Sequence, residues 1–129
     1  MDNLIINAGE RSPQVDFDFA IGHLSLRGES YPEDASAVFG PIFAAVEAFL
    51  TQADGPAIQF DFELIYFNSS SAKALMNLFK ILDQAGKLGR SITVNWLFAP
   101  DDETMKEFGE DFAEDIAHIA FHLVESPAE

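Results

Sequence analysis

Apolar and polar residues alternate along four stretches of the chain, with the period of two that is typical of strands with one buried face. The four stretches are residues 15–19, residues 23–27, Ile58–Phe67 and residues 91–98. Ile21 and Gly22 form a turn between the first two stretches, which predicts a hairpin. The third stretch ends at residues 65–67 with apolar residues on both faces, which predicts a central strand. A last, edge strand is predicted over residues 120–124.

Between the later strands, apolar residues recur with a period of about 3.6 residues, which predicts three helices. The first helix extends from about residue 34 to residue 50, and Pro41 within it predicts a kink or a late start. The second begins after Asn68, and the third begins at residues 100–102, where two aspartates suit a first helical turn. The apolar positions that define the helices are Val38, Ile42, Val46 and Phe49; Leu75, Leu78, Phe79 and Leu82; and Met105, Phe108 and Phe112.

The predicted order of elements is β-β-α-β-α-β-α-β. Strands that alternate with helices after an opening hairpin form a mixed β-sheet with helices packed on it, which is an α/β fold. This order resembles the STAS architecture of anti-sigma-factor antagonists. The chain contains no repeat, linker or composition break, so we expect residues 1–129 to form a single domain.

The amino-acid composition excludes several classes of protein and several kinds of site. Hydrophobic residues make up 48% of the chain, which excludes a disordered acidic tail, and the absence of cysteine excludes disulfides, thiolate catalysis and cysteine-based zinc sites. The formal charge of −15 disfavours nucleic acid and anionic membranes and favours a protein partner with a basic face, although acidity also serves solubility alone. We see no signal peptide and no apolar run near the length of a membrane span, so we expect a cytoplasmic protein.

One segment places hydroxyl groups at a predicted strand-to-helix corner. Residues 66–73 lead from the long strand into the second helix and contain Asn68, Ser69, Ser70 and Ser71. The first N–H groups of a helix are unpaired and the helix dipole is positive there, so a phosphate on one of these serines would be tolerated. The alternative is an ordinary N-cap at Asn68 or Ser69.

Charged residues form two further patterns. Lys73, Lys80 and Lys87 recur every seven residues along the second helix, either to bind an acidic partner or a phosphate, or as a plain polar face. Residues 101–115 carry eight acids and one lysine. This segment is either a solvated helix face or an acidic recognition face for a partner.

Patterns that would indicate catalysis or metal binding are weak. The serines at residues 69–71 lack a G-x-S-x-G frame, and no sequence signal brings a histidine to them. Glu114, His118 and His122 have the spacing of metal ligands only if one helix contains all three. The acidic cluster at residues 101–103 lacks the spaced ligands of a calcium loop. We therefore expect a protein that is not an enzyme and holds no metal or cofactor.

Several segments, taken in order, resemble the SiaC family of small regulatory phosphoproteins. They are residues 28–33 (Gly-Glu-Ser-Tyr-Pro-Glu), residues 66–73 (Tyr-Phe-Asn-Ser-Ser-Ser-Ala-Lys), Trp96, residues 101–105 (Asp-Asp-Glu-Thr-Met) and residues 109–115 (Gly-Glu-Asp-Phe-Ala-Glu-Asp). Together they cover nearly the whole chain. The resemblance implies a STAS-like fold, which agrees with the pattern of predicted elements.

The resemblance also implies a phosphorylation-dependent partner switch. In family members, a histidine-kinase-like (GHKL) Ser/Thr kinase phosphorylates the residue after the corner Asn, and a PP2C-type phosphatase reverses the reaction. The unmodified form binds and activates a diguanylate cyclase, which raises cyclic-di-GMP and favours biofilm. The matching position here is Ser69, where the best-known member has Thr, and Ser70 and Ser71 are alternative acceptors.

Contacts with partners are expected around the same corner. The expected contact residues are Tyr31, Pro32, Glu33, Asn68, Ser70, Lys73, Asp102 and Glu103. Residues 31–33 either contact the kinase or fold the loop beneath the site. Two other functions remain open: a STAS-type antagonist of an anti-sigma factor with the same phosphorylation switch, and a small metal-dependent enzyme that uses the acidic cluster.

Overall fold

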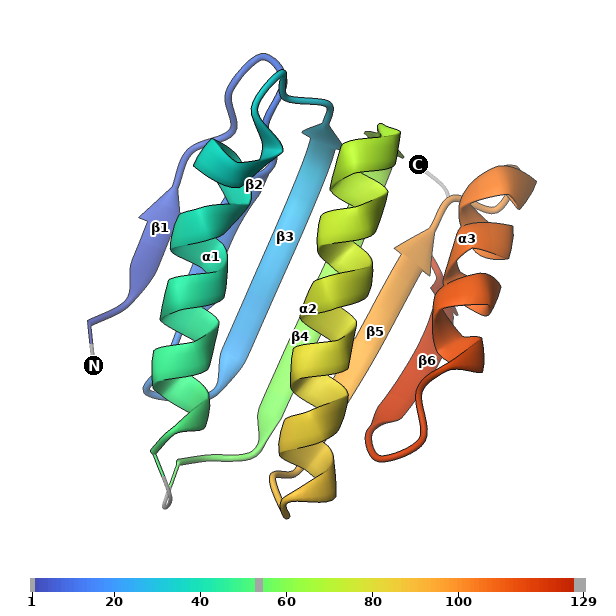
Figure 1. The fold of residues 1–129 in the computed structure, drawn as a ribbon. Helices are drawn as coiled ribbons and strands as arrows, with labels where there is room; N and C mark the ends of the chain where they lie inside the picture. The colour runs from blue at the N-terminus through green and yellow to red at the C-terminus, as the bar shows by residue number, and fades with distance from the viewer. Residues whose placement is uncertain (1, 53–54, 127–129) are drawn as a thin grey trace.

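The computed structural model describes residues 2–52 and 55–126. Within them, six strands form one sheet, and three helices pack on it (Figure 1). The strands are β1 (Leu4–Ile6), β2 (Gln14–Asp18), β3 (His23–Ser30), β4 (Ile58–Phe67), β5 (Ile92–Phe98) and β6 (Ala120–Glu125). The helices are α1 (Ala35–Leu50), α2 (Ser69–Lys87) and α3 (Glu103–Glu114). The α/β class and the mixed sheet predicted from the sequence are confirmed.

Neighbouring strands in the sheet follow the order of the chain. β1 and β2 pair antiparallel, as do β2 and β3, whereas β3, β4, β5 and β6 run parallel with one helix in each connection. Crossovers between parallel strands are almost always right-handed, so three successive crossovers in one direction place every helix on the same face. Figure 1 shows α1, α2 and α3 side by side on that covered face. Among the described residues, no helix covers the other face, which is called the bare face below.

Side chains alternate between the covered face and the bare face along the long strands. In β4, Phe60, Phe62 and Leu64 are buried under the helices, whereas Asp61 and Glu63 lie on the bare face. Each buried phenylalanine stabilises the fold by about 1.5–3 kcal/mol relative to an exposed one. The core therefore lies entirely between the sheet and the helices.

Trp96 and Gly109 bring α3 close to the sheet. Trp96 is 1% exposed, and its indole Nε1–H donates a hydrogen bond to the Met105 carbonyl oxygen at 2.9 Å. A Cβ atom on Gly109 would collide with the Trp96 ring and with Leu123 of β6. Glycine at this position therefore allows α3 to pack over both β5 and β6.

The structure corrects the predicted extent of the first strands. β1 was missed, because three consecutive apolar residues show no period. β3 continues to Ser30, three residues beyond the predicted strand of residues 23–27. Gly28 has a φ of +106° where the register with β4 shifts, so a bulge keeps this end of β3 paired with β4.

The central position predicted for β4 is confirmed, whereas one of the two effects predicted for Pro41, a late helix start, is wrong. The end of β4 is not covered on both faces, since Ile65 is 69% exposed and Tyr66 is 52% exposed. β4 is central within the sheet, but helices cover only one side of it. Pro41 causes no late helix start, because Asp34 caps α1 by accepting the Ala37 N–H at 3.2 Å, and Pro41 itself is exposed.

Candidate functional site

The predicted site residues lie along one edge of the sheet. The four parallel strands end at this carboxyl edge, and α1, α2 and α3 each begin there (Figure 1). Residues 31–33 follow β3, residues 68–73 follow β4, and Asp102 and Glu103 follow β5. In open parallel sheets this edge is the usual position of binding sites, because the loops after successive strands converge there.

Asn68 connects the start of α2 to the end of β3. Its side-chain Oδ1 accepts the Ser71 N–H at 2.9 Å and the Ser70 hydroxyl at 3.1 Å. Its backbone N–H donates to the Ser30 carbonyl at 3.0 Å, and its Nδ2 donates to the Pro32 carbonyl at 3.4 Å. Asn68 is therefore the N-cap of α2, and it also holds the loop after β3 against this helix.

The three serines after Asn68 have different surroundings. Ser71 is fully buried, and its hydroxyl shares a 2.9 Å hydrogen bond with the buried hydroxyl of Ser30. Ser70 is exposed but donates to Asn68. Ser69 is exposed, and its hydroxyl makes no hydrogen bond within the described part of the chain. As the first residue of α2, Ser69 also has an amide N–H with no acceptor inside the helix.

The loop after β3 packs beside this corner. The Tyr31 ring meets the Tyr66 ring edge to face at 5.8 Å between centroids, and its hydroxyl donates to the Glu10 carbonyl at 3.1 Å. Pro32 is buried, and Glu33 forms an exposed ion pair with Arg11 at 2.9 Å. Exposed pairs of this kind add little stability. Tyr31 and Pro32 thus fold the loop, and Glu33 points to solvent beside the corner.

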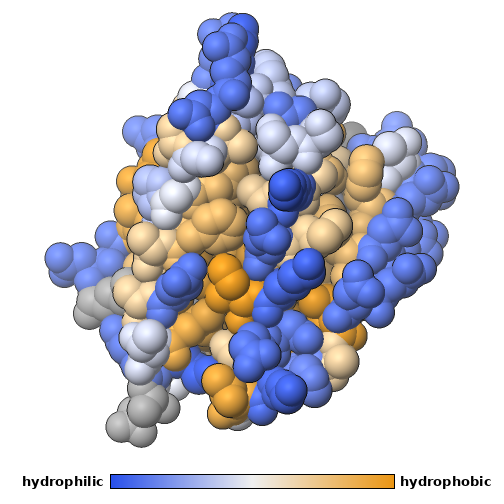
Figure 2. All heavy atoms as spheres, in the orientation of Figure 1, coloured by the Kyte–Doolittle hydropathy of each residue, from blue (hydrophilic) through white to orange (hydrophobic). Residues whose placement is uncertain are grey.

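The lysine row continues from Ser69 along α2. Ser69, Lys73, Lys80 and Lys87 occupy positions i, i+4, i+11 and i+18, so they share one side of the helix, and all four are exposed. None of the three lysines forms an ion pair within residues 2–52 and 55–126. In Figure 2, hydrophilic side chains follow α2 and cover α3, whereas the surface over α1 is mostly apolar.

Asp102 and Glu103 lie at the same edge but above the next strand. Asp102 caps α3, because its Oδ1 accepts the Met105 N–H at 3.0 Å, and Glu103 is exposed in the first turn. The Phe67 ring at the end of β4 contacts Phe108 of α3 at 4.8 Å between centroids. Phe67 therefore links α3 to the corner.

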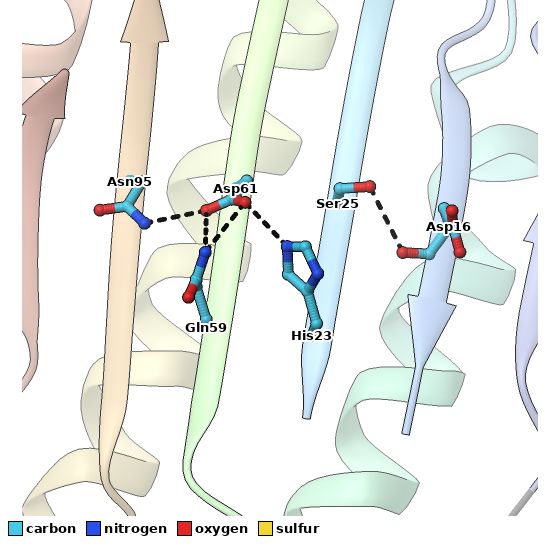
Figure 3. A network of polar contacts seen from close by, with 6 residues as sticks. All are labelled: Asp16, His23, Ser25, Gln59, Asp61 and Asn95. Atoms are coloured by element: carbon cyan, nitrogen blue, oxygen red, sulfur yellow. Dashed lines mark hydrogen bonds and ion pairs between the residues drawn. The ribbon is translucent and has the colours of Figure 1, made fainter. Parts of the chain in front are cut away.

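A polar network on the bare face was not predicted from the sequence (Figure 3). The Asp61 carboxylate binds the His23 ring nitrogen at 2.8 Å and accepts hydrogen bonds from Asn95 at 2.9 Å and from Gln59 at 3.1 Å. Partial burial raises the pKa of Asp61, but hydrogen bonds from His23, Asn95 and Gln59 outweigh it, so the pKa lies below its ordinary value. These residues meet because β3, β4 and β5 pair in this register. The alternation of apolar and polar residues along a single strand does not determine how that strand is aligned with its neighbours.

The histidines do not support a catalytic or metal site. His23 lies at the start of β3, whereas the serines follow the end of β4, so they lie at opposite ends of the parallel strands. α3 ends at Glu114, so Glu114, His118 and His122 do not share a helix. Within residues 2–52 and 55–126, no group of three or more His, Asp or Glu side chains is arranged to hold a metal ion.

None of the described helices is both long and apolar enough to cross a membrane.

Comparison with known proteins gives consistent matches over nearly the whole chain. The model of a family described as "SiaC family regulatory phosphoprotein" matches residues 6–126. An uncharacterized protein of Pseudomonas aeruginosa (strain UCBPP-PA14) is 35% identical over 115 residues, which are 89% of this chain and 90% of that protein.

Two solved structures from Pseudomonas aeruginosa share the fold. Apo-SiaC has a TM-score of 0.85 at 31% identity, and the match covers 98% of this chain and 100% of that one. The second structure is that of the diguanylate cyclase SiaD in complex with its activator SiaC. Its matching chain has a TM-score of 0.90 at 32% identity, over 95% of this chain and 99% of that one.

Proposed function

The chain belongs to the SiaC family of regulatory phosphoproteins, and on that basis we propose that it activates a diguanylate cyclase and is switched off by phosphorylation. The observation that supports activation most strongly is the complex in which SiaC of Pseudomonas aeruginosa is the activator of SiaD. In this proposal the protein is not itself an enzyme. It raises cyclic-di-GMP through its client and so favours biofilm.

The proposed acceptor of the phosphate is Ser69. Its hydroxyl is exposed and makes no hydrogen bond within the described residues, so a kinase could reach it without disturbing the fold. Ser70 would first have to give up its bond to Asn68, and Ser71 is buried against Ser30. We propose a GHKL-type kinase and a PP2C-type phosphatase as the pair that adds and removes the phosphate.

The start of α2 suits a phosphate on Ser69. The N–H groups of Ser69 and Ser70 lack acceptors within the helix, and Lys73 lies one turn away on the same side. Favourable charge at a helix start contributes about 0.3–1 kcal/mol, so the modified chain would keep its fold. The switch then acts on binding and leaves the architecture intact.

The effect of the phosphate on a partner follows from its charge. Phosphorylation adds about −1.5 to −2 charges at neutral pH. A partner surface that covers Ser69 in the unmodified protein would have to bury this charge without a matching cation. An unpaired charge at an interface costs about 2–5 kcal/mol, which is roughly 30-fold to several-thousand-fold in affinity.

Two measurements on cells of the natural host test the proposal. Phosphopeptide mass spectrometry across residues 68–73, in planktonic and surface-grown cells, should find phosphate on Ser69. Capture of partners with the unmodified protein should retrieve a diguanylate cyclase. Recovery of a sigma-factor regulator in place of a cyclase would instead support the STAS-type antagonist, and phosphate only on Ser70 would reassign the acceptor.

A further inference from the structure

Within residues 2–52 and 55–126, β6 forms an edge of the sheet with no strand paired to its far side. In the described residues it pairs only with β5, and it is six residues long, whereas β1 at the other edge has three. The Ser126 N–H donates to the Phe98 carbonyl of β5 at 2.7 Å. Because these groups alternate in direction along a strand, the backbone N–H and C=O groups of Phe121, Leu123 and Glu125 point away from β5.

This edge lacks three of the features by which proteins usually prevent edge pairing, and its one acidic residue, Glu125, stands at the end of the strand. β6 contains no proline and no lysine, and its register with β5 shows no bulge. Leu123 is 37% exposed and Val124 is 36% exposed. A regular edge strand with exposed apolar side chains accepts an additional strand unless it is blocked. The side of β6 that faces away from β5 can therefore pair with a strand of another chain.

Acidic side chains on α3, next to β6, determine which kind of partner segment fits this edge strand. Glu103, Glu107, Glu110 and Glu114 occupy positions i, i+4, i+7 and i+11 of α3, so they form one exposed stripe. Asp111 and Asp115, by contrast, line the cavity of about 250 Å³ between α3 and α2. The glutamate stripe thus lies on the flank of α3 away from α2, over the side of the sheet where β6 forms the edge.

We propose that β6 accepts an extended basic segment of a partner protein as a seventh strand. Alternate side chains of that strand would point toward α3, where lysine or arginine would meet the glutamate stripe, and the others would lie beside Val124 on the bare face. A second copy of this chain is a poor occupant, because pairing two β6 strands would bring together two acidic helices and two chains of charge −15. This surface is separate from the Ser69 corner and does not depend on its role.

The test uses the full chain and a fluorescent hexapeptide of alternating lysine and valine. Binding is followed by anisotropy, and hydrogen exchange should show new protection of the Phe121, Leu123 and Glu125 amides. A peptide of the same sequence, N-methylated at its two central residues, keeps the charge but cannot form a continuous ladder. We expect it to bind about tenfold more weakly or worse, because several hydrogen bonds are lost.

Variants of Val124 give a second readout. Val124→Lys places a charge at the edge and should weaken peptide binding about tenfold or more, whereas the matched control Val124→Thr should change it less than about threefold. Equal binding of the two peptides would overturn the proposal, because charge alone would then explain it. So would an absence of binding, or a dimer of the free chain that Val124→Lys abolishes.

Discussion

Two polar clusters tie neighbouring strands of this sheet together, and they differ in what they leave unpaired. On the bare face, both oxygens of Asp61 are engaged, by His23 and Gln59 on one side and by Asn95 on the other. At the corner, Asn68 is also fully engaged, but the Ser69 hydroxyl beside it makes no hydrogen bond in the described residues. The first cluster is complete as a structural element. The second presents one nucleophilic group that the fold does not need.

The largest effect should separate the two clusters by function. We expect Ser69→Asp to weaken binding of a SiaD-type cyclase roughly 30-fold or more, because a charge is then buried in the interface, and Ser69→Ala to bind as the parent chain does. Asp61→Asn, which alters the other cluster, should leave the affinity unchanged. Isothermal titration of the cyclase with each variant measures this. Equal binding by Ser69→Asp and Ser69→Ala would contradict the assignment of Ser69.

The buried hydroxyl pair beneath the corner should behave as structure and not as a switch. Replacing Ser30 alone or Ser71 alone by alanine leaves the other hydroxyl buried and unpaired, which should lower the free energy of unfolding by about 1–3 kcal/mol. The double variant Ser30→Ala/Ser71→Ala should lose less than the two single changes added together, because no polar group is then orphaned. Urea unfolding of the three variants gives these values. Strict additivity would show that the pair does not act as a unit.

The cap should matter through its acceptor more than through its donor. Asn68→Ala should destabilise the protein by about 1–2 kcal/mol, because the Ser71 N–H loses its acceptor. Asn68→Asp keeps that acceptor and loses only the long bond to the Pro32 carbonyl, so it should cost less. Thermal unfolding compares them, and a larger loss in Asn68→Asp than in Asn68→Ala would reverse this order.

The smallest effect should come from the titration of Asp61. Its pKa is lowered in the folded state, so its ionised form stabilises the protein above the ordinary carboxyl range, and this contribution is lost as the pH falls through the folded pKa. Asp61→Asn should therefore be less stable than the parent near pH 7 and closer to it near pH 3. Urea unfolding from pH 3 to pH 7 measures the difference. A gap between the two proteins that does not change with pH would contradict the lowered pKa.

The sequence predicted the corner well because local signals determine it. Alternation ends at Phe67, helical spacing begins after Asn68, and Asn at such a boundary is a common cap, so the cap and the neighbouring hydroxyls were found together. It could not predict which serine turns inward. That depends on the rotation of α2 relative to β3, which brings Ser71 against Ser30, a residue that lies beyond the predicted strand of residues 23–27.

The bare face was predicted less well, because pairing between strands determines it. The Asp61 network requires the register of β3, β4 and β5, which no local pattern contains. The exposure of Ile65 and Tyr66 likewise depends on all three helices lying on one face. The local hydrophobic period predicted every element except β1, together with their order, whereas the contacts between distant elements are seen only in the folded chain.

The most direct test of the switch is a cyclase assay with two forms of this protein. One form is unmodified, and the other carries phosphoserine at Ser69, introduced during synthesis so that the modification is complete. We expect the unmodified form to increase cyclic-di-GMP production by a SiaD-type cyclase and the phosphorylated form to leave it at the basal rate. Equal activation by the two forms would contradict a phosphorylation switch at Ser69.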